Sequence, residues 1–209
     1  MSYKTIRKRT EASFTEKKSE FIGYISPAAT EEEAVTFISE IRAMHRKATH
    51  NCYAYILRHN NTGRHSDDGE PGGTAGMPIY DVLSKNGITD VVCVVTRYFG
   101  GILLGTGGLV HAYSKGASMA LANSEIVTME VADSLKISCD YTMYGIISSV
   151  LPEYEAIIRN TEYTDSVCVF ADVRTELTDS LTTKLILRLS ATSIVTISEF
   201  ASAIDAPFE

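Results

Sequence analysis

The chain has 209 residues, 44% of them hydrophobic, and a formal net charge of -7 at pH 7. This length allows one large domain or two small ones with packed cores. No apolar run reaches the roughly 18 residues of a membrane-spanning helix, and the N-terminal residues lack the apolar segment of a signal peptide. We therefore expect a cytoplasmic protein without membrane contact.

Charge and cysteine positions restrict the possible ligands. Residues 134–209 hold 5 Lys and Arg against 11 Asp and Glu, so a nucleic-acid partner would need a local basic patch, which this acidic part does not offer. The cysteines lie far apart without a CxxC pair, which predicts reduced core residues and neither a metal site nor a cofactor: Cys52, Cys93, Cys139 and Cys168.

The first elements are predicted to be strands and one helix. β-prone residues alternate with basic ones over residues 3–24, which is typical of protected edge strands, with a phosphate-binding arm as the alternative. Thr30 and Glu33 form a capping box, so we expect a helix from Thr30 to near Lys47. Residues 51–57 predict the next strand, and His50 stands just before it.

A polar loop is predicted from His59 to Gly76, and it holds three carboxylates within four positions, at Asp67, Asp68 and Glu70. A solvated turn would explain them, and Mg²⁺ held over a phosphate is the alternative. An EF-hand does not fit, because the two aspartates are adjacent instead of alternating. Thr74 is expected to cap a helix that ends at Gly87.

A candidate anion site follows the most apolar strand of the chain. Residues 91–95 (VVCVV) predict a central strand covered on both faces, and Arg97 leaves its C-terminal end. Five glycines then lead to a helix over residues 108–124, where a close backbone approach and free N–H groups suit an anion. No Walker motif or dinucleotide fingerprint is present, and a tight crossover packed on its own sheet is the alternative interpretation.

The remaining residues predict a second, smaller domain. Residues 128–134 are expected to form a boundary, followed by strands over residues 135–141, 166–174 and 194–200 and helices over residues 143–160, with a kink or break at Pro152, and 178–191. This order is typical of a ferredoxin-like split βαβ unit, so the fold class is α+β. We expect this domain to bind a partner and not to catalyse a reaction, because it holds no cluster of His, Cys or carboxylates with site-like spacing.

Three motifs together, at residues 48–55 (ATHNCYAY), 67–79 (DDGEPGGTAGMPI) and 96–113 (TRYFGGILLGTGGLVHAY), closely resemble the YigZ/IMPACT family. The resemblance implies that residues 1–130 have a mixed sheet like the second domain of a small-subunit ribosomal protein and domain IV of the translocation elongation factor. It implies that residues 134–209 look like that factor's last, ferredoxin-like domain. Eukaryotic relatives regulate translation initiation, whereas the biochemical role of the bacterial members is unsettled.

The resemblance favours a translation-associated binding protein whose partner is RNA, the ribosome or a translation factor. An anion such as an RNA phosphate would contact the residues of the glycine turn and their neighbours: Thr74, Arg97, Tyr98, Gly100, Gly101, Gly105, Gly107, Gly108 and Lys115. One departure from the family is His111, where Arg or Lys is usual, and neutral histidine makes this face less basic.

Two other classes of function stay open. In an enzyme, Asp67, Asp68 and Glu70 would bind a cation or act as a base and His50 would transfer protons, with hydrolysis of a phosphate or amide bond as the favoured reaction. That hypothesis requires the loops that hold His50, Asp68 and Arg97 to meet. In a protein-binding module, the same polar residues would only fix the loop geometry.

Overall fold

The computed structural model describes residues 2–189 and 196–208. The described chain divides into two compact units, which we call the first domain (residues 3–127) and the second domain (from residue 128 onward). The expected boundary at residues 128–134 is part of one continuous strand, β7 (Ile126–Cys139), in which Ala132, Asp133 and Ser134 are already buried.

The first domain is built on a five-stranded sheet in the order β2-β3-β6-β4-β5. Its strands, preceded by β1 (Tyr3–Ile6), are β2 (Thr10–Glu16), β3 (Ser19–Pro27), β4 (His50–Leu57), β5 (Thr62–Ser66) and β6 (Val91–Tyr98). All four ladders between these strands are antiparallel, so the prediction of a mixed sheet is wrong. The parallel bridge between Lys4 and Ile88 lies outside this sheet. β5 was predicted as loop, because its residues TGRHS are too polar to show a strand pattern.

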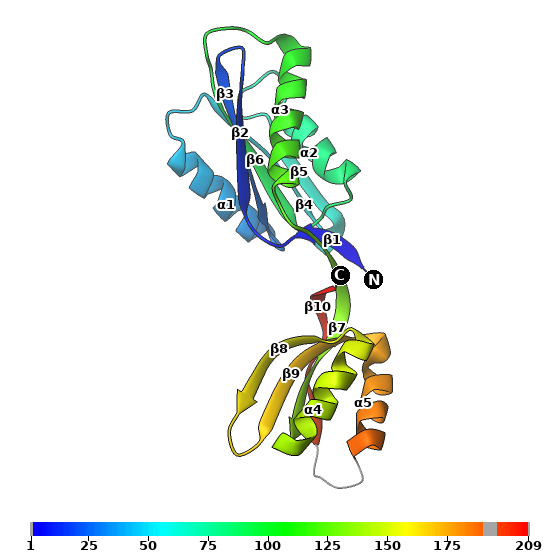
Figure 1. The fold of residues 1–209 in the computed structure, drawn as a ribbon. Helices are drawn as coiled ribbons and strands as arrows, with labels where there is room; N and C mark the ends of the chain where they lie inside the picture. Colours follow the sequence, from blue (N-terminus) through cyan, green and yellow to red (C-terminus); the bar gives the residue numbers. More distant parts are fainter. Residues whose placement is uncertain (1, 190–195, 209) are drawn as a thin grey trace. The chain divides into compact units, whose positions relative to one another are not determined.

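Helices cover both faces of this sheet (Figure 1). They are α1 (Glu31–Met44), α2 (Gly76–Lys85) and α3 (Gly105–Ala122), with a short 3₁₀ turn, η1 (His59–Asn61), between β4 and β5. The predicted cap of α1 is confirmed, since Thr30 accepts from the Glu33 N–H and the Glu33 carboxylate accepts from the Ala29 N–H. α3 begins three residues before the predicted start.

The central strand β6 is buried on both faces, as its apolar sequence predicted. Val91, Cys93 and Val95 join the core beneath α2 and α3, whereas Val92 and Val94 join a second core beneath α1. α3 lies very close to the sheet, because Gly23 and Gly116 have no side chains to separate them. This contact fixes the beginning of α3 above one end of the sheet.

Four loops meet at that end of the sheet, which we call the loop end. The strand pairs Glu20↔Tyr98, Arg97↔His50 and Tyr53↔Ser66 place the relevant strand ends side by side. The loops are therefore the β2–β3 turn, the α1–β4 turn, the β5–α2 loop and the β6–α3 loop: residues 17–18, 45–49, 67–75 and 99–104.

The second domain has the predicted element order of a split βαβ unit. Its sheet joins β8 (Ile157–Tyr163), β9 (Val167–Arg174), β7 and β10 (Thr196–Phe208), and its helices are α4 (Tyr141–Val150), the 3₁₀ helix η2 (Leu151–Tyr154) and α5 (Thr175–Leu189). The predicted helix 143–160 ends at Val150, and the break predicted at Pro152 is confirmed by the 3₁₀ helix that begins at Leu151. The helix predicted over residues 157–160 is wrong, because these residues belong to β8, which pairs with β9. Residues 190, 191, 194 and 195 of the predicted last helix and strand lie outside the described residues.

None of the described helices has the length and apolarity needed to cross a membrane. The four cysteines are free thiols, as predicted, and three of them are buried.

Candidate functional site

The centre of the loop end is a buried ion pair between Arg97 and Glu70. Arg97 Nη1 lies 2.6 Å from Glu70 Oε1, and the two side chains are only 6% and 3% exposed. The Arg97 guanidinium also lies near the rings of Phe21 and Phe99, at 5.5 and 5.3 Å from their centroids. Burial of both charges is tolerable because each compensates the other.

Two more side chains meet the same carboxylate. The hydroxyl of Tyr113 donates to Glu70 Oε1 at 2.8 Å, and His50 Nε2 lies 3.8 Å from that oxygen. Burial raises the pKa of Tyr113, so its hydroxyl stays protonated and serves as a donor. His50 Nδ1 lies 2.8 Å from the carbonyl oxygen of Asp68, and since a carbonyl only accepts, Nδ1 carries the proton. In the neutral ring, Nε2 is then an acceptor.

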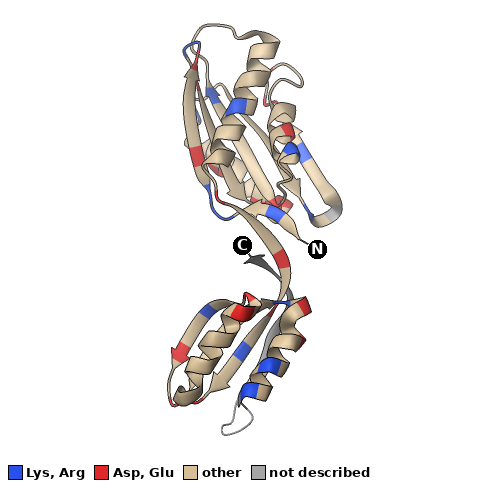
Figure 2. Ribbon diagram, turned by 45° about the vertical axis from the view of Figure 1, so that its right-hand side comes forward, with Lys and Arg blue, Asp and Glu red and all other residues tan. Residues whose placement is uncertain are grey.

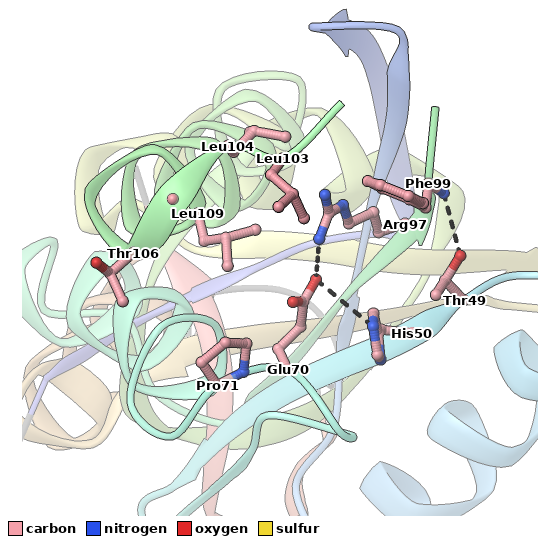
Figure 3. A pocket seen from close by; sticks show the side chains of 11 residues that line it. Thr49, His50, Glu70, Pro71, Arg97, Phe99, Leu103, Leu104, Thr106 and Leu109 are labelled. Carbon is pink, nitrogen blue, oxygen red and sulfur yellow. Dashed lines mark hydrogen bonds and ion pairs between the residues drawn. The ribbon is translucent and has the colours of Figure 1, made fainter. Parts of the chain in front are cut away.

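A pocket of about 360 Å³ opens above this cluster (Figure 3). Its floor consists of His50, Glu70 and Arg97, and its walls are mainly apolar, formed by residues of the β5–α2 loop, the β6–α3 loop and α3: Pro71, Phe99, Leu103, Leu104 and Leu109. Leu103 is 82% exposed and Phe99 45% exposed, although both are large apolar residues. A concave site with apolar walls and a few polar groups is the usual form of a ligand pocket.

Asp67 organises the loop that carries Glu70. Its carboxylate accepts hydrogen bonds from the backbone N–H groups of Gly73, Ala75 and Gly76 at 2.8 to 2.9 Å. Partial burial by itself would raise the pKa of Asp67, but these three hydrogen bonds together outweigh burial and hold the pKa below its usual value. The Asp67 carboxylate therefore accepts hydrogen bonds from the first N–H groups of α2, and the predicted cap by Thr74 is wrong, because the Thr74 hydroxyl donates to the Pro71 carbonyl oxygen.

Asp68 has a similar structural role. It adopts a positive φ of 44°, which short polar residues tolerate, and its carboxylate accepts from the N–H of Asn51 and from Arg42, both at 2.7 Å. The carboxylates of Asp67 and Asp68 are thus engaged by protein donors. Among residues 2–189 and 196–208, no group of three or more His, Cys, Asp or Glu side chains is arranged to hold a metal ion.

The Asp67 hydrogen bonds predict a pH dependence of stability. A carboxyl whose folded pKa lies below its unfolded value of about 3.9 contributes stability above that value, and the contribution is lost as the pH falls through the folded pKa. We expect Asp67→Asn to cost about 1–3 kcal/mol at pH 7. Urea denaturation between pH 7 and pH 3 should show a smaller acid loss in the variant than in the parent chain. An equal loss in both would contradict this role of Asp67.

The glycines of the predicted anion site have different environments. Gly100 lies against the β2–β3 turn, where an added Cβ would come within 2.0 Å of the Lys18 backbone. Gly101 and Gly105 adopt positive φ values, and no atom would hinder a Cβ at Gly107. The N-cap residue Leu104 makes no side-chain hydrogen bond to the first N–H groups of α3, which lie beside the pocket that Gly105 and Thr106 help to line.

The structure brings only part of the predicted anion set together. The Tyr98 hydroxyl pairs with His45 Nδ1 at 2.9 Å, and the Thr74 hydroxyl donates to the Pro71 carbonyl oxygen, so both are engaged within the protein. Lys115 lies over the ring of Phe14, at 4.4 Å from the centroid, and is not among the residues that line the pocket. Gly108 contacts Leu104, and His111 is exposed on α3.

Exposed cations lie instead on two other loops at the same end. Lys17 and Lys18 form the tip of the β2–β3 hairpin, where Figure 2 shows basic residues, and Arg46 and Lys47 lie in the α1–β4 turn. The sequence suggested a phosphate-binding arm near the N-terminus only as an alternative to a protected edge. The signal that could have placed the lysines is the antiparallel pairing of β3 with β6, which brings residues 17–18 beside the glycines.

Comparison with known proteins agrees with the resemblance. Residues 17–121 match the family described as the Impact N-terminal domain, and residues 137–192 match a domain of unknown function, DUF1949. The "IMPACT family member YvyE" of Bacillus subtilis is 41% identical over 79% of this chain and 77% of its own length. The "IMPACT family member YigZ" of Escherichia coli is 37% identical over 70% and 74%.

The chain belongs to the IMPACT family. A solved structure described as that of a hypothetical protein is 30% identical, covers 97% of both chains and superimposes with a TM-score of 0.62. Animal relatives share only part of the chain: "Protein IMPACT" of Oryctolagus cuniculus is 29% identical over 46% of this chain and 32% of its own length.

Proposed function

We propose that this chain is a translation-associated binding protein of the cytoplasm, and that its first domain binds RNA at the loop end of the sheet. The binding chemistry is charge pairing with phosphates and stacking against exposed apolar side chains, without a covalent step. The connection with translation rests on the family resemblance, which implies that eukaryotic relatives regulate translation initiation. A cytoplasmic location is part of the proposal, since translation takes place there.

The observation that carries the proposal is the arrangement of exposed groups at the loop end. Lys17 and Lys18 lie on one side of the β6–α3 loop, Arg46 and Lys47 belong to the α1–β4 turn, and exposed Phe99 and Leu103 lie on the loop itself. No Asp or Glu occurs between Asp90 and Glu125. Cations combined with exposed aromatic and apolar side chains are typical of single-stranded RNA binding.

Arg97 is not the phosphate-binding cation in this proposal. Its guanidinium is buried and paired with Glu70, so a phosphate would have to break that ion pair to reach it. The exposed lysines require no such rearrangement. The net charge of residues 134–209, with 5 basic against 11 acidic side chains, also favours the first domain as the RNA-binding part.

Co-sedimentation with ribosomes across a salt series tests the proposal. We expect salt-sensitive binding by the parent chain and, for Lys17→Ala/Lys18→Ala, roughly tenfold weaker binding with a salt slope reduced by about 1–2, because two phosphate contacts are lost. Lys8→Ala/Lys85→Ala removes the same charge at the other end of the sheet and should bind like the parent. Binding that is independent of salt, or equally weakened in both variants, would contradict the proposal.

A second candidate is an enzyme that acts on a phosphate-containing small molecule. The observation in its favour is that the loops of His50, Asp68 and Arg97 meet, as that hypothesis required, because His50 Nδ1 lies 2.8 Å from the Asp68 carbonyl oxygen and His50 pairs with Arg97 in the sheet. His50, Glu70 and Arg97 also line one pocket. Because the Asp67 and Asp68 carboxylates are engaged by protein donors, acid–base chemistry would rest on His50 and Glu70. Turnover in a screen of phosphorylated compounds with Mg²⁺, lost in His50→Gln, would support it, and the absence of turnover would contradict it.

A further inference from the structure

The pocket above Glu70 has the form of a site for a flat, partly polar ligand. Its volume of about 360 Å³ lies near the lower limit of small-molecule sites, which span roughly 300–1,000 Å³. Phe99 and Leu103 are exposed at its walls, and Leu109 is buried at its side. A flat ligand would cover these exposed apolar side chains, whose contact with water is unfavourable.

Beside the Arg97 guanidinium, which is already paired with Glu70, the floor of the pocket presents two hydrogen-bond acceptors. Glu70 Oε1 receives the Arg97 and Tyr113 hydrogen bonds, whereas Oε2 receives none from the described residues and is drawn on the side of Pro71 and Leu109 (Figure 3). His50 Nε2 is an acceptor in the neutral ring, because Nδ1 donates to the Asp68 carbonyl oxygen. The ligand must therefore carry donors at its inner edge.

A cationic ligand does not suit this floor, although a carboxylate lies there. Arg97 already compensates the charge of Glu70, and Lys18, whose backbone lies against Gly100, brings further positive charge to the neighbouring loop. A neutral group with N–H donors can bind to the acceptors without electrostatic repulsion from Arg97 and Lys18. Nucleobases with an exocyclic amino group are neutral, flat and equipped with such donors.

We propose that this pocket holds one unstacked base of the RNA, and that it prefers guanine. Guanine carries a ring N–H and an amino group side by side on one edge, so both can donate to the Glu70 carboxylate, whose Oε2 accepts from none of the described residues. Uracil places carbonyl oxygens on both sides of its single ring N–H, so one of them would face the Glu70 carboxylate. The inference rests on the proposed RNA binding and names the base that the same surface recognises.

The flanking nucleotides then lie where the exposed cations are. Lys18 adjoins the β6–α3 loop at Gly100, next to Phe99 at the pocket wall, and Lys17 precedes it in the same turn. A strand whose base enters the pocket therefore has its phosphates near the β2–β3 turn. Phosphate contacts give affinity and the base gives specificity.

Fluorescence anisotropy with the full chain tests the base pocket. The probes are short oligouridines with one central position varied as guanosine, inosine or uridine. We expect guanosine to bind about tenfold more tightly than uridine, with inosine between them because it keeps the ring N–H and lacks the amino group. Phe99→Ala and Leu103→Ser should each reduce the difference between guanosine and uridine to less than about threefold.

Ile102→Ala is the matched control, because Ile102 is exposed on the same loop and does not line the pocket. It should keep the guanosine preference. Equal, salt-sensitive affinity for the three oligonucleotides would overturn the base pocket and leave the proposed RNA binding standing. A guanosine preference that survives both pocket variants would also overturn it. Absence of salt-sensitive binding to every probe would overturn the proposed function and the base pocket together.

Discussion

Glu70→Ala is expected to lower the free energy of unfolding by about 3–5 kcal/mol, because it leaves the buried Arg97 charge without a partner. Glu70 also accepts the hydrogen bond of the buried Tyr113 hydroxyl, which would lose its acceptor. Urea denaturation of the full chain, followed by circular dichroism, measures this loss. The variant should also lose the guanosine preference, since Glu70 forms the pocket floor.

Two controls separate the ion pair from a general effect of removing charge. Asp81→Ala breaks an exposed ion pair with Lys85, whose side chain is 77% exposed, and should cost at most about 0.5 kcal/mol. Glu70→Leu/Arg97→Leu removes both buried charges and should be more stable than Glu70→Ala, because no unpaired charge is left. A Glu70→Ala loss below about 1 kcal/mol would contradict the burial of the ion pair.

Gly23→Ala is expected to cost about 3 kcal/mol, the upper part of the usual range for overpacking, because the new methyl group meets backbone and not a flexible side chain. A Cβ at Gly23 would lie 2.3 Å from the Gly116 carbonyl oxygen, so α3 would have to move away from β3. Because the pocket includes Gly105, Thr106 and Leu109 at the beginning of α3, oligonucleotide binding should weaken as well.

Gly72→Ala is the matched glycine control. No atom lies within 4 Å of a Cβ at Gly72, and its φ is not in the left-handed region, so the change should alter stability by at most about 0.5 kcal/mol. The midpoints of thermal unfolding of Gly23→Ala, Gly72→Ala and the parent chain distinguish an effect of close packing from a general effect of replacing glycine. A similar shift for both would contradict the close approach of α3 to the sheet.

Much of the fold could be predicted because its signals are local. The capping box at Thr30 and the apolar run of residues 91–95 each specify an element within a few residues, and the structure confirms both. β5 was not predicted, because its polar residues show no strand pattern and their pairing with β4 exists only in the folded sheet. Residues 157–160 were assigned to a helix because a strand beginning with Ile157 and Ile158 lacks a clear alternating pattern.

The sequence identifies which residues belong to the candidate site, but it does not predict how they are arranged. Motif residues such as Glu70, Arg97 and His50 were identified as functional candidates, but their separation in sequence gives no sign that they would pair with one another. A cation site in the acidic loop was the alternative to a solvated turn, whereas the Asp67 carboxylate accepts hydrogen bonds from the N–H groups of Gly73 and Ala75 in the loop and of Gly76 at the start of α2. The sequence favours edge protection as the role of Lys17 and Lys18, because the position of Lys18 beside Gly100 depends on strand pairing.

Amide chemical shifts of the isotopically labelled chain, titrated with the guanosine-containing oligouridine, test the central claim most directly. The account predicts that the shifted residues belong to the β2–β3, α1–β4, β5–α2 and β6–α3 loops, with the largest changes near Lys17, His50 and Phe99. Changes confined to the second domain, or to the other end of the first-domain sheet, would contradict RNA binding at the loop end.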